Sequence, residues 1–494
     1  MNGNLQGLTE ETRAARWDIT GLGADSRAIK PGFLFAALPG SRADGAAFIP
    51  DAVRRGAVAV LAPPGARLPA GCESALLITD PEPRRRLALM AARFFGAQPR
   101  TVAAVTGTNG KTSTVRFLHQ IWSRLGHRAA SLGTLGLDAP DFGAPVPDDD
   151  GPTLTTADPV ALHRTLARLA EGGIDRLAME ASSHGLAQYR LDGVRLAAAG
   201  LTNISRDHLD HHGSMNAYRA AKFRLFAELL GDGGTAVLNA DAPEFAALAD
   251  ICAGRGIAVL SYGRKGRDLR LADLAPAAGG GQRLTVELHG RTHEIDLPLA
   301  GDFQAANALC ALGLALACGA EAEGAVAALA GLTGVPGRLE AIGSTADGAA
   351  VYVDYAHTPD ALAHLLRALR PHARGRLAVL FGCGGDRDPG KRPEMGAIAR
   401  DLADAVYVTD DNPRGEEAAT IRKAILAACP GAVEIGDRRL AIETAIAGLG
   451  AGDLLVIAGK GHETGQIVGD TTLPFDDRAV ARAVLARRDA GVPS

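Results

Sequence analysis

The sequence lacks paired cysteines, long apolar runs and basic blocks, each of which would point to a different class of protein. Its six cysteines are scattered without a CxxC pair, which excludes a disulfide framework and a zinc site: Cys72, Cys252, Cys310, Cys318, Cys383 and Cys429. No uncharged apolar run reaches the length of about 18 residues that crosses a bilayer. The formal net charge of −4, without a basic block, gives no electrostatic case for nucleic acid. We therefore expect neither membrane insertion nor a nucleic-acid partner.

Aromatic residues are also scarce, at 4% of the chain, whereas 61 glycines accompany many alanines. This composition favours helices packed closely against sheets. The N-terminal stretch MNGNLQGLTEETRAARWDIT is polar and lacks the apolar core of a signal peptide, so we expect a cytoplasmic protein, and a monomer. With 494 residues, the chain is too long for a single core and should form about two to four domains.

The order of apolar and helical patterns predicts an α/β protein with three domains. Short apolar runs such as GFLFAALPG predict a small α/β domain over residues 1–92. Over 93–336, continuous apolar runs alternate with helical patterns, which indicates a mainly parallel sheet around a phosphate loop. Within it, the polar stretch 264–300 predicts a small β excursion, followed by a long helix. The alternation restarts at 337 and predicts a second, Rossmann-like α/β domain over 337–494.

The segment AAVTGTNGKTST places a glycine-rich turn between a predicted buried strand and a predicted helix. Backbone N–H groups of such a turn, together with the helix N-terminus, bind phosphate oxygens. Lys111 would reach the terminal phosphates, and the Thr112 hydroxyl would bind Mg²⁺. Val105 stands where the general Walker pattern has a glycine, so the motif is a shorter GxxGKT that begins at Gly107. The order of strand, loop and helix nevertheless predicts ATP binding.

Charged side chains follow other predicted strands, at the edge where ligands bind in open α/β sheets. Glu180 ends the run DRLAMEAS, and a carboxylate beside Thr112 would suit magnesium and ATP phosphates. His208 lies in SRDHLDHHG, and Lys222 lies on an amphipathic helix. Taken alone, these two residues are more typical of a loop histidine and a solvated surface charge.

The last predicted domain carries two further strand ends of this kind. In VYVDYAHTPDAL, Asp354 could accept ribose hydroxyls, and Tyr355 could stack on a base. Arg338, upstream in GVPGRLE, could equally be a linker residue. VYVTDDNPRGEE places Asp411 and Arg414 three residues apart after a strand. This stretch is either a solvated turn or a pocket for a ligand that carries both charges.

These motifs, taken in order along the chain, resemble those of the Mur ligases, the ATP-dependent enzymes that add amino acids during peptidoglycan synthesis. The resemblance covers essentially the whole chain and rests on TGTNGKTST, MEASSHGL, TNISRDHLDHHG, AAKFRLF, GRLE, DYAHTPDAL, FGCGGDRDPGKR, DDNPR and AGKGHE. It implies that ATP phosphorylates the γ-carboxylate of D-glutamate in a UDP-linked muramoyl dipeptide. An amine of the incoming amino acid then attacks the acyl phosphate.

The resemblance also implies roles for individual residues. ATP would be bound by Gly107, Thr108, Asn109, Gly110, Lys111, Thr112, Ser113, Asn307, Arg338 and Asp354. Magnesium would be held by Thr112, Glu180, His208 and an N-carboxylated Lys222. Lys111, Glu180, His208 and Lys222 would thus be the catalytic residues.

The same resemblance implies that residues 1–92 form a nucleotide-substrate domain and that residues 337–494 form an amino-acid-binding domain. The UDP-linked substrate would contact Ala24, Ser26, Ser41, Arg42, Ala43, Leu154, Thr155, Thr156, Ser182, Gln188 and Arg190. The amino acid would contact Arg387, Asp411, Asn412, Pro413, Arg414, Gly459 and Glu463. The sequence departs from the family pattern at Leu154 and Gln304, where relatives carry asparagine.

The form DDNPR is associated with meso-diaminopimelate, whereas lysine-adding relatives carry a neutral residue in place of the arginine. A distal carboxylate requires a cation, ideally a bidentate guanidinium such as that of Arg414. Lysine has no such carboxylate and would leave Arg414 unpaired, at a cost of about 2–5 kcal/mol. Asp411, Asn412 and Glu463 would meet the ammonium end of the ligand.

Other functions remain open at this point. A lysine-adding ligase is disfavoured by Arg414, and a folylpolyglutamate or cyanophycin-type ligase is disfavoured by DNPR and SRDHLDHHG. A non-catalytic ATP-binding protein of this fold is a further alternative. Such a protein would be expected to have lost Lys111, Glu180 or Lys222, and all three are present.

Overall fold

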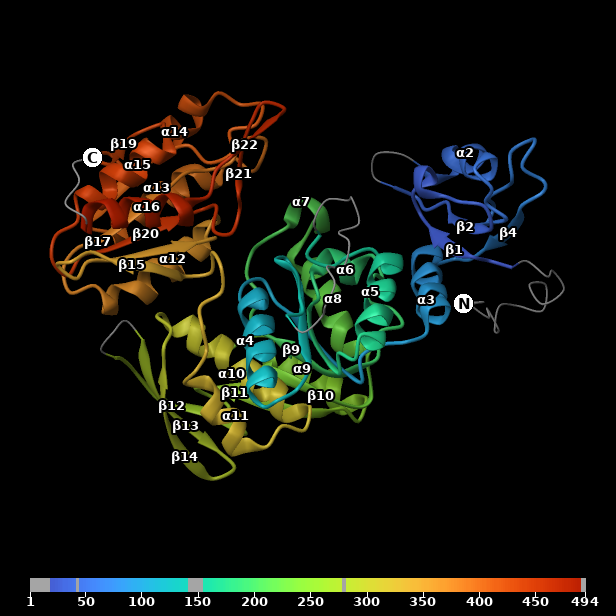
Figure 1. Ribbon diagram of the computed structural model, residues 1–494, viewed down its shortest axis with the longest axis horizontal. Coiled ribbons are helices and arrows are strands. Elements are labelled where there is room, and N and C mark those ends of the chain that lie inside the picture. Colours follow the sequence, from blue (N-terminus) through green and yellow to red (C-terminus); the bar gives the residue numbers. More distant parts are fainter. Residues whose placement is uncertain (1–17, 41–43, 141–153, 278–280, 490–494) are drawn as a thin grey trace. The chain divides into compact units, whose positions relative to one another are not determined.

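A computed structural model describes residues 18–40, 44–140, 154–277 and 281–489 of the chain (Figure 1). The residues group into two compact units. Unit 1 comprises residues 1–261 and 313–321, and unit 2 comprises residues 262–312 and 322–494. Each unit contains a largely parallel sheet with helices packed against it.

Unit 1 begins with a small parallel sheet in the order β1-β2-β3-β4. Its elements are β1 (Gly21–Gly23), β2 (Phe33–Ala36), β3 (Ala59–Ala62), β4 (Leu76–Thr79), α2 (Ile49–Arg54) and α3 (Pro83–Phe95). Successive residues of a strand point to opposite faces, so β2 contributes to two cores. Leu34 and Ala36 join one core, and Phe35 joins the other.

In unit 1, the larger sheet has the order β11-β10-β9-β5-β8-β6-β7, and three further strands of the same ten-stranded sheet follow β11 in unit 2. Its strands are β5 (Thr101–Thr106), β6 (Ala129–Gly133), β7 (Gly136–Asp138), β8 (Arg176–Glu180), β9 (Leu196–Leu201), β10 (Leu230–Asn239) and β11 (Ala258–Gly263). β5 pairs in parallel with both β8 and β9. Residues 102–105 of β5 are fully buried, as expected for a strand covered on both faces. The loops after β5, β8 and β9 therefore start side by side at one edge of the sheet.

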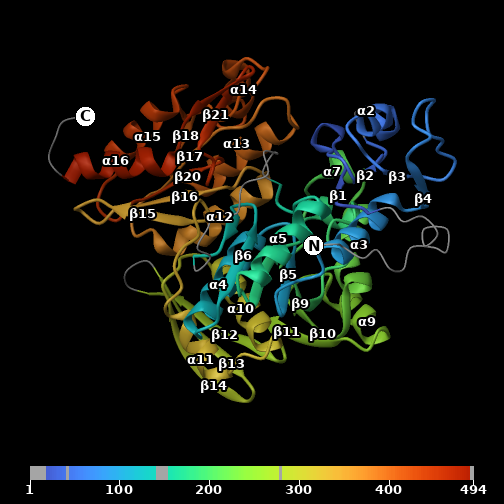
Figure 2. The same cartoon turned by 45° about the vertical axis from the view of Figure 1, so that its right-hand side comes forward.

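Helices flank this sheet: α4 (Lys111–Arg124), α5 (Pro159–Glu171), α6 (Ser183–Ala187), α7 (Leu209–His212), α8 (Met215–Arg224) and α9 (Phe245–Gly254). α4 packs against β6 and β8, and Figure 2 shows α4 beside β6. Within the described residues, no helix is both long and apolar enough to cross a membrane.

Unit 2 contains the β excursion that the sequence predicts for 264–300. It consists of β12 (Leu269–Pro276), β13 (Gln282–Leu288) and β14 (Arg291–Leu297), and β13 pairs antiparallel with both neighbours. Two helices follow, α10 (Asp302–Ala317) and α11 (Ala322–Leu329). α10 confirms the predicted long helix.

The second sheet of unit 2 has the order β15-β16-β20-β17-β18-β19. Its strands are β15 (Glu340–Ser344), β16 (Ala350–Asp354), β17 (Leu377–Phe381), β18 (Ala405–Val408), β19 (Val433–Glu434) and β20 (Leu454–Ala458). All of its pairings are parallel except that of the edge strand β15 with β16. A separate hairpin consists of β21 (Gly465–Val468) and β22 (Thr471–Pro474).

The two faces of this sheet carry separate cores. Helices α12 (Pro359–Leu369), α13 (Lys391–Leu402) and α14 (Ala418–Leu426) contribute to one core, and α15 (Arg438–Ala447) and α16 (Asp477–Asp489) contribute to the other. In β20, Leu454 and Val456 face the first core, whereas Leu455 and Ile457 face the second. This double burial explains why the strand sequences are continuously apolar.

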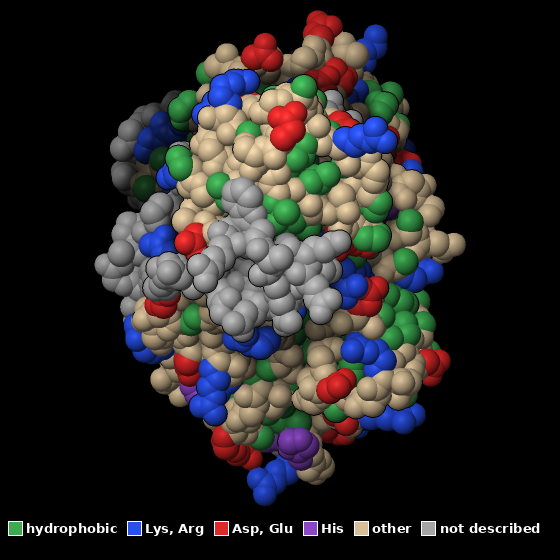
Figure 3. Space-filling view, turned by 90° about the vertical axis from the view of Figure 1, so that its right-hand side faces the viewer, with side chains coloured by type: hydrophobic (Ala, Val, Ile, Leu, Met, Phe, Trp, Pro, Cys, Tyr) green, Lys and Arg blue, Asp and Glu red, His purple; other side chains and the backbone are tan. Residues whose placement is uncertain are grey.

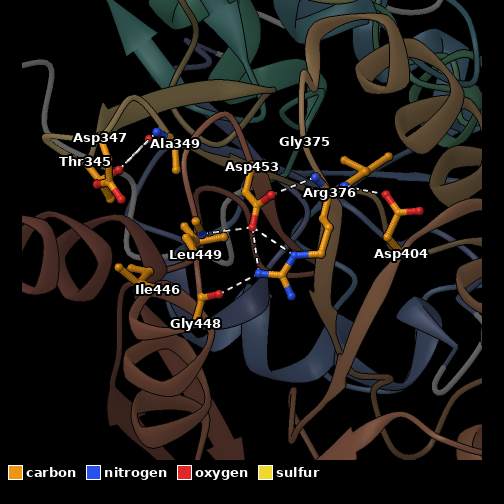
Figure 4. A network of polar contacts seen from close by, with 12 residues as sticks. Thr345, Asp347, Ala349, Gly375, Arg376, Asp404, Ile446, Gly448, Leu449 and Asp453 are labelled. Atoms are coloured by element: carbon orange, nitrogen blue, oxygen red, sulfur yellow. Dashed lines mark hydrogen bonds and ion pairs between the residues drawn. The ribbon is translucent and has the colours of Figure 1, made fainter.

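The amino ends of β17 and β20 are joined by a polar network (Figure 4). Arg376, just before β17, donates through Nη2 to Asp453 Oδ2 at 2.7 Å and through its backbone N–H to Asp453 Oδ1 at 2.7 Å. Leu377 N–H donates to Asp404 Oδ2 at 2.7 Å. These contacts fix the edge of the sheet that is opposite to the loops following the strands.

The predicted α/β class with mainly parallel sheets is confirmed. The domain limits at 92/93 and 336/337 stay a prediction. On the face drawn in Figure 3, basic and acidic side chains are interspersed.

Candidate active site

The phosphate loop connects the end of β5 to the start of α4, as the sequence predicts. Gly107 has a φ of 153° and Gly110 a φ of 84°, and the helix begins at Lys111. A side chain at Gly107 would place its Cβ 1.9 Å from Thr202 Oγ1, on the neighbouring strand end. Only glycine therefore allows the loop to lie this close to the end of β9.

Two lysine side chains converge on this loop. Lys111 Nζ donates to the carbonyl oxygens of Gly107 and Thr108, both at 2.9 Å. Lys222 Nζ donates to the same Gly107 carbonyl oxygen at 2.7 Å. The loop therefore presents two cationic side chains that share one neutral acceptor.

Lys222 is buried, so its reading as a solvated surface charge is wrong. It is 1% exposed, and its Nζ lies 4.5 Å from the centre of the Tyr218 ring. Tyr218 is buried on the same helix, and its hydroxyl lies 3.0 Å from Thr108 Oγ1, so this face of α8 packs against the phosphate loop. Burial, followed by the charge of Lys111, lowers the pKa of Lys222 well below its usual value.

Glu180 ends β8, next to β5, and is 1% exposed. Its Oε1 accepts the backbone N–H of Thr134 at 2.8 Å, and its Oε2 accepts the Thr134 hydroxyl at 3.2 Å. Thr112 and Glu180 line one small hollow between α4 and the ends of β6 and β8. The structure thus brings together the two oxygen donors that the sequence assigns to magnesium.

His208 has a left-handed backbone conformation, with φ 51°, just before α7. Burial is the main cause that lowers its pKa, and the charges of Lys111 and Lys222 lower it further. It belongs to a cluster with three other imidazoles: its ring centre lies 4.8 Å from that of His184, which in turn lies 4.0 Å from His211 and 5.5 Å from His212. Burial and these neighbours lower the pKa of His184 to about 4.

The cluster does not by itself form a metal site. In the part of the chain that is described, no group of three or more His, Cys, Asp or Glu side chains is arranged to hold a metal ion. The metal role of His208 stays a prediction.

The residues assigned to the UDP-linked substrate fall into three groups. Ala24 and Ser26 lie beside the short turn Ser26–Ala28 in the small sheet domain, and Ser26 is buried. Ser41, Arg42 and Ala43 lie outside the described residues. Leu154 is 43% exposed, whereas Thr155 contacts Thr134, with 3.1 Å between their hydroxyl oxygens. Thr134 therefore connects the predicted substrate segment to Glu180.

The remaining members of this set are brought together after β8. The Thr156 hydroxyl donates to the Glu180 carbonyl oxygen at 3.0 Å and accepts the Ser182 backbone N–H at 3.0 Å. The Arg190 guanidinium donates to Thr156 O at 2.6 Å and to Gln188 Oε1 at 2.7 Å. Hydroxyl groups and a guanidinium thus gather where a diphosphate or a carboxylate could bind.

The residues assigned to ATP in unit 2 form a second polar group. Gln304 Nε2 donates to Arg338 O at 2.9 Å, and Asn307 Nδ2 donates to Gln304 Oε1 at 3.2 Å. Gln304, which departs from the family pattern, therefore links the other two residues. Asp354 accepts the backbone N–H groups of Leu339 and Ala356, both at 2.7 Å, and burial raises its pKa.

Arg338 is not a free linker residue. Its guanidinium carbon lies 4.4 Å from the centre of the Tyr355 ring. The Tyr355 ring centre lies 4.6 Å from that of His357 and 5.1 Å from that of His462. Flat rings beside Asp354 are a suitable surface for stacking a base.

The stretch DDNPR forms a buried turn, so the solvated-turn reading is wrong. Asp411 is 8% exposed and Asn412 is 4% exposed. The turn follows β18, whose neighbour β17 continues into the glycine-rich loop 382–387. A Cβ at Gly385 would lie 1.9 Å from Pro413 O, and the Arg414 guanidinium donates to Gly385 O at 2.8 Å. Arg414 itself has φ 52°, a strained backbone conformation held by these neighbours.

The loop after β20 contacts this turn through Gly459 and Glu463. Gly459 has φ 110°, and a Cβ there would lie 2.7 Å from Asp411 Oδ2. Glu463 Oε2 accepts Asn412 Nδ2 at 2.9 Å. The structure thus gathers the assigned residues from the ends of β18 and β20.

The hairpin β21–β22 supports the same turn. Arg414 N–H donates to Ile467 O at 3.0 Å, Gly469 N–H donates to Arg414 O at 2.7 Å, and Gln466 Nε2 donates to Asp411 O at 2.8 Å. Arg387 is less integrated: it is exposed, and its guanidinium donates to the adjacent Asp386 O at 3.3 Å.

Several residues of the site were missed from the sequence. The side chains of Thr134 and Tyr218 contact assigned residues, and both lie outside the quoted motifs. The side chain of Lys460 also contacts an assigned residue, Asn412. Lys460 lies inside AGKGHE, and its place in that motif is the signal that could have identified it.

A phosphate loop, a strand-end carboxylate and a second α/β unit with a pocket of mixed charge define an ATP-dependent ligase. Comparison with family profiles agrees: residues 18–94 match the Mur ligase family catalytic domain, residues 105–315 the Mur ligase middle domain, and residues 337–461 the Mur ligase glutamate ligase domain. The chain belongs to the Mur ligase family, and the expected three-domain fold of that family is confirmed.

Individual relatives cover nearly the full length. A protein of Mesorhizobium japonicum, named UDP-N-acetylmuramoyl-L-alanyl-D-glutamate–2,6-diaminopimelate ligase, is 53% identical over 484 residues, or 97% of this chain and 98% of that protein. A protein of the same name from Bradyrhizobium diazoefficiens is 52% identical over 487 residues, or 97% of each chain.

Two solved structures extend the comparison. One of a ligase with that name has a TM-score of 0.70 at 33% identity, covering 96% of each chain. MurF ligase from Thermotoga maritima, solved in complex with ADP, has a TM-score of 0.61 at 18% identity, covering 96% of this chain and 97% of that one, and shows the fold alone.

Proposed function

We propose that this ligase adds meso-diaminopimelate to the D-glutamate of UDP-N-acetylmuramoyl-L-alanyl-D-glutamate, using ATP, in peptidoglycan synthesis. The observation that carries the proposal is the buried turn 410–414, in which acidic Asp411 and basic Arg414 stand on either side of Asn412 and Pro413. Relatives about 52% identical over nearly the whole chain bear the name of this ligase.

The pocket of unit 2 suits an amino acid with a charged group at each end. We propose that Arg414, supported by Arg387, binds the distal carboxylate, and that Asp411, Asn412 and Glu463 bind the ammonium end. Because Gly459 has no side chain, the loop after β20 can lie close to the Asp411 carboxylate. One guanidinium nitrogen of Arg414 is held by Gly385 O, and its other N–H groups would bind the distal carboxylate of diaminopimelate. The side chain of a lysine substrate has no such carboxylate.

At the phosphate loop, residues 107–113 would hold the phosphates of ATP. Lys111 would neutralise the charge that develops on the transferred phosphoryl group. Asn307, Arg338 and Asp354 of unit 2 are the further residues that we propose to contact ATP, with the Tyr355 ring stacking on the base. Thr155, Thr156, Ser182, Gln188 and Arg190 would orient the UDP-linked substrate, so that its γ-carboxylate can attack the terminal phosphate of ATP with release of ADP. The amine of the amino acid would then attack the resulting acyl phosphate and displace phosphate.

The residues at the loop also fit a magnesium ion. Thr112 and Glu180 supply oxygen donors in one hollow, and oxygen ligands are those that magnesium prefers. When bound, the ion would neutralise charge on the phosphate oxygens. Lysine reacts with carbon dioxide as the uncharged amine, and burial and the charge of Lys111, which lower the pKa of Lys222, favour loss of its proton. Lys222 would then become a carbamate and supply a further oxygen donor.

Carboxylation would also remove the repulsion between Lys222 and Lys111, because it turns one of the two neighbouring cations into an anion. His208 would be a fourth donor in this proposal.

The remaining proposals concern the setting of the reaction. We propose a cytoplasmic monomer with domains over residues 1–92, 93–336 and 337–494. These limits lie near the ends of the matched family domains, 18–94, 105–315 and 337–461.

One assay tests the proposed reaction. Purified protein is incubated with ATP, Mg²⁺ and the UDP-linked dipeptide, and phosphate release is compared with diaminopimelate, with lysine and without amino acid. We expect release that depends on diaminopimelate. Phosphate release that occurs with lysine but not with diaminopimelate would overturn the proposed specificity. If neither amino acid causes phosphate release, a non-catalytic ATP-binding protein is supported instead.

A further inference from the structure

Lys460 is a fully buried lysine directly beside the amino-acid pocket. It follows β20 and is 0% exposed. Its Nζ donates to Asn412 Oδ1 at 2.9 Å and to Glu463 Oε2 at 3.2 Å. Both acceptors are residues that the proposed function assigns to diaminopimelate, although Lys460 is not itself assigned to any ligand.

Burying an ammonium group is unfavourable unless hydrogen bonds and opposite charge compensate for the lost water. An apolar side chain of similar length, such as methionine, could fill the same space without this cost. The two acceptors of Lys460 lie on different segments, one on the turn after β18 and one on the loop after β20. The cation therefore joins the two halves of the pocket.

Lys460 also determines which way the Asn412 amide points. A lysine ammonium has donors only, so it must face the amide oxygen. Asn412 Oδ1 accepts from Lys460 Nζ and from Ile467 N–H, at 2.9 and 3.0 Å. Asn412 Nδ2 then faces Glu463 Oε2 at 2.9 Å. Without Lys460, Asn412 Oδ1 would keep only the Ile467 N–H as a donor, and Glu463 would lose its ion pair with Lys460.

We propose that Lys460 is a positioning residue for amino-acid binding, which orients Asn412 and holds Glu463 so that both can receive the ammonium end of the substrate. This inference rests on the proposed function. Lys460 acts through its two neighbours and is not a ligand of ATP or of the UDP-linked substrate. Loss of Lys460 should therefore weaken the binding of diaminopimelate and leave the binding of ATP and of the UDP-linked dipeptide unchanged.

The test compares Lys460→Met, Glu463→Gln and the double variant with the wild-type enzyme. In steady-state assays, Lys460→Met should raise the KM for diaminopimelate by about tenfold to 100-fold, the range expected when hydrogen bonds to a charged group are lost. The KM values for ATP and the UDP-linked dipeptide should stay within about twofold of wild type. Because Lys460 acts through Glu463, the effects in the double variant should be strongly non-additive.

Arg376→Met is the matched control, since it removes a cation from the same unit at the opposite edge of the sheet (Figure 4). It should lower stability without a selective change in the KM for diaminopimelate. If Lys460→Met fails to fold, Lys460→Gln replaces it, because glutamine keeps a donor for Asn412 Oδ1. That variant should raise the same KM to a smaller extent.

Each outcome decides between the claims. A wild-type enzyme without diaminopimelate-dependent turnover contradicts the proposed function itself. If wild type is active, the role of Lys460 is overturned by an unchanged KM for diaminopimelate, by equal rises for all three substrates, or by additive effects with Glu463→Gln.

Discussion

Lys111 and Lys222 donate to the same acceptor, the carbonyl oxygen of Gly107, at 2.9 and 2.7 Å. Two like charges that share one neutral oxygen repel each other strongly where water is excluded. Lys222 is 1% exposed, so solvent screens it little. Under the proposed mechanism, this arrangement would become favourable through two anions, the phosphates of ATP and a carbamate on Lys222.

The variant Lys222→Ala should lose nearly all ligase activity, because the oxygen donor that a carbamate would supply disappears. Added short carboxylates such as formate or acetate should restore part of the activity by occupying the space left by the side chain. Phosphate release at saturating substrates measures both effects. Full activity of the variant would contradict the carbamate role, and Lys423→Ala, on α14 of unit 2, serves as a control lysine.

The variant Arg414→Ala should lower kcat/KM for diaminopimelate by a factor that corresponds to about 2–5 kcal/mol, since a buried charge pair with the distal carboxylate is lost. The relative use of lysine should rise, because no unpaired guanidinium remains. Competition assays with the two amino acids measure this ratio. Arg400→Ala, which removes an exposed pair with Asp401, should leave the ratio unchanged.

The variant Asp477→Asn should destabilise unit 2 by about 3–5 kcal/mol, because it leaves the Arg438 charge buried without its partner. Both side chains are 0% exposed, and Arg438 Nη2 lies 2.7 Å from Asp477 Oδ2. Chemical denaturation of the full chain measures the loss.

A double variant, Arg438→Met with Asp477→Leu, should be more stable than Asp477→Asn, since no unpaired charge stays in the core. It should still bind diaminopimelate poorly, because Arg438 also donates to Asp410 O and Ala458 O, which start the two loops of the pocket. A single variant as stable as wild type would contradict this prediction.

His462 should make the folded protein sensitive to mild acid. Burial, together with the charges of Arg338 and Arg478, lowers the pKa of His462 to about 4, from an ordinary value near 6.5. Between these two pH values the unfolded chain binds the proton and the folded chain does not, so stability is present above pH ~6.5 and is lost as the pH falls toward 4. His462→Gln should reduce that loss. Thermal unfolding at pH 7.5 and at pH 5 should show a smaller difference for the variant, and equal differences would contradict the assignment.

Most of the fold could be predicted because it depends on local patterns. Runs such as residues 102–105 of β5 and 454–458 of β20 are apolar at every position, and the structure buries them on both faces. The phosphate loop and the turn 410–414 could be located because glycine, proline and charged residues directly follow such runs.

What could not be predicted depends on contacts between distant segments. Lys222 looks like a surface residue on its own helix, and only the packing of α8 against the phosphate loop buries it. Thr134 joins Glu180 to Thr155 across 46 and 21 residues of sequence, a relationship that no local pattern encodes. Lys460 meets Asn412 from another strand end for the same reason.

The hairpin β21–β22 has a consequence for attempts to change the amino acid that this enzyme uses. The Arg414 backbone donates its N–H to Ile467 O and accepts the Gly469 N–H, so the turn and the hairpin form one structural unit and not two independent segments. If the turn alone were replaced by that of a lysine-adding relative, the new turn would lack the hairpin residues that hydrogen-bond to its backbone. An exchange of residues 409–416 together with residues 459–475 would replace the turn and also the hairpin that supports it.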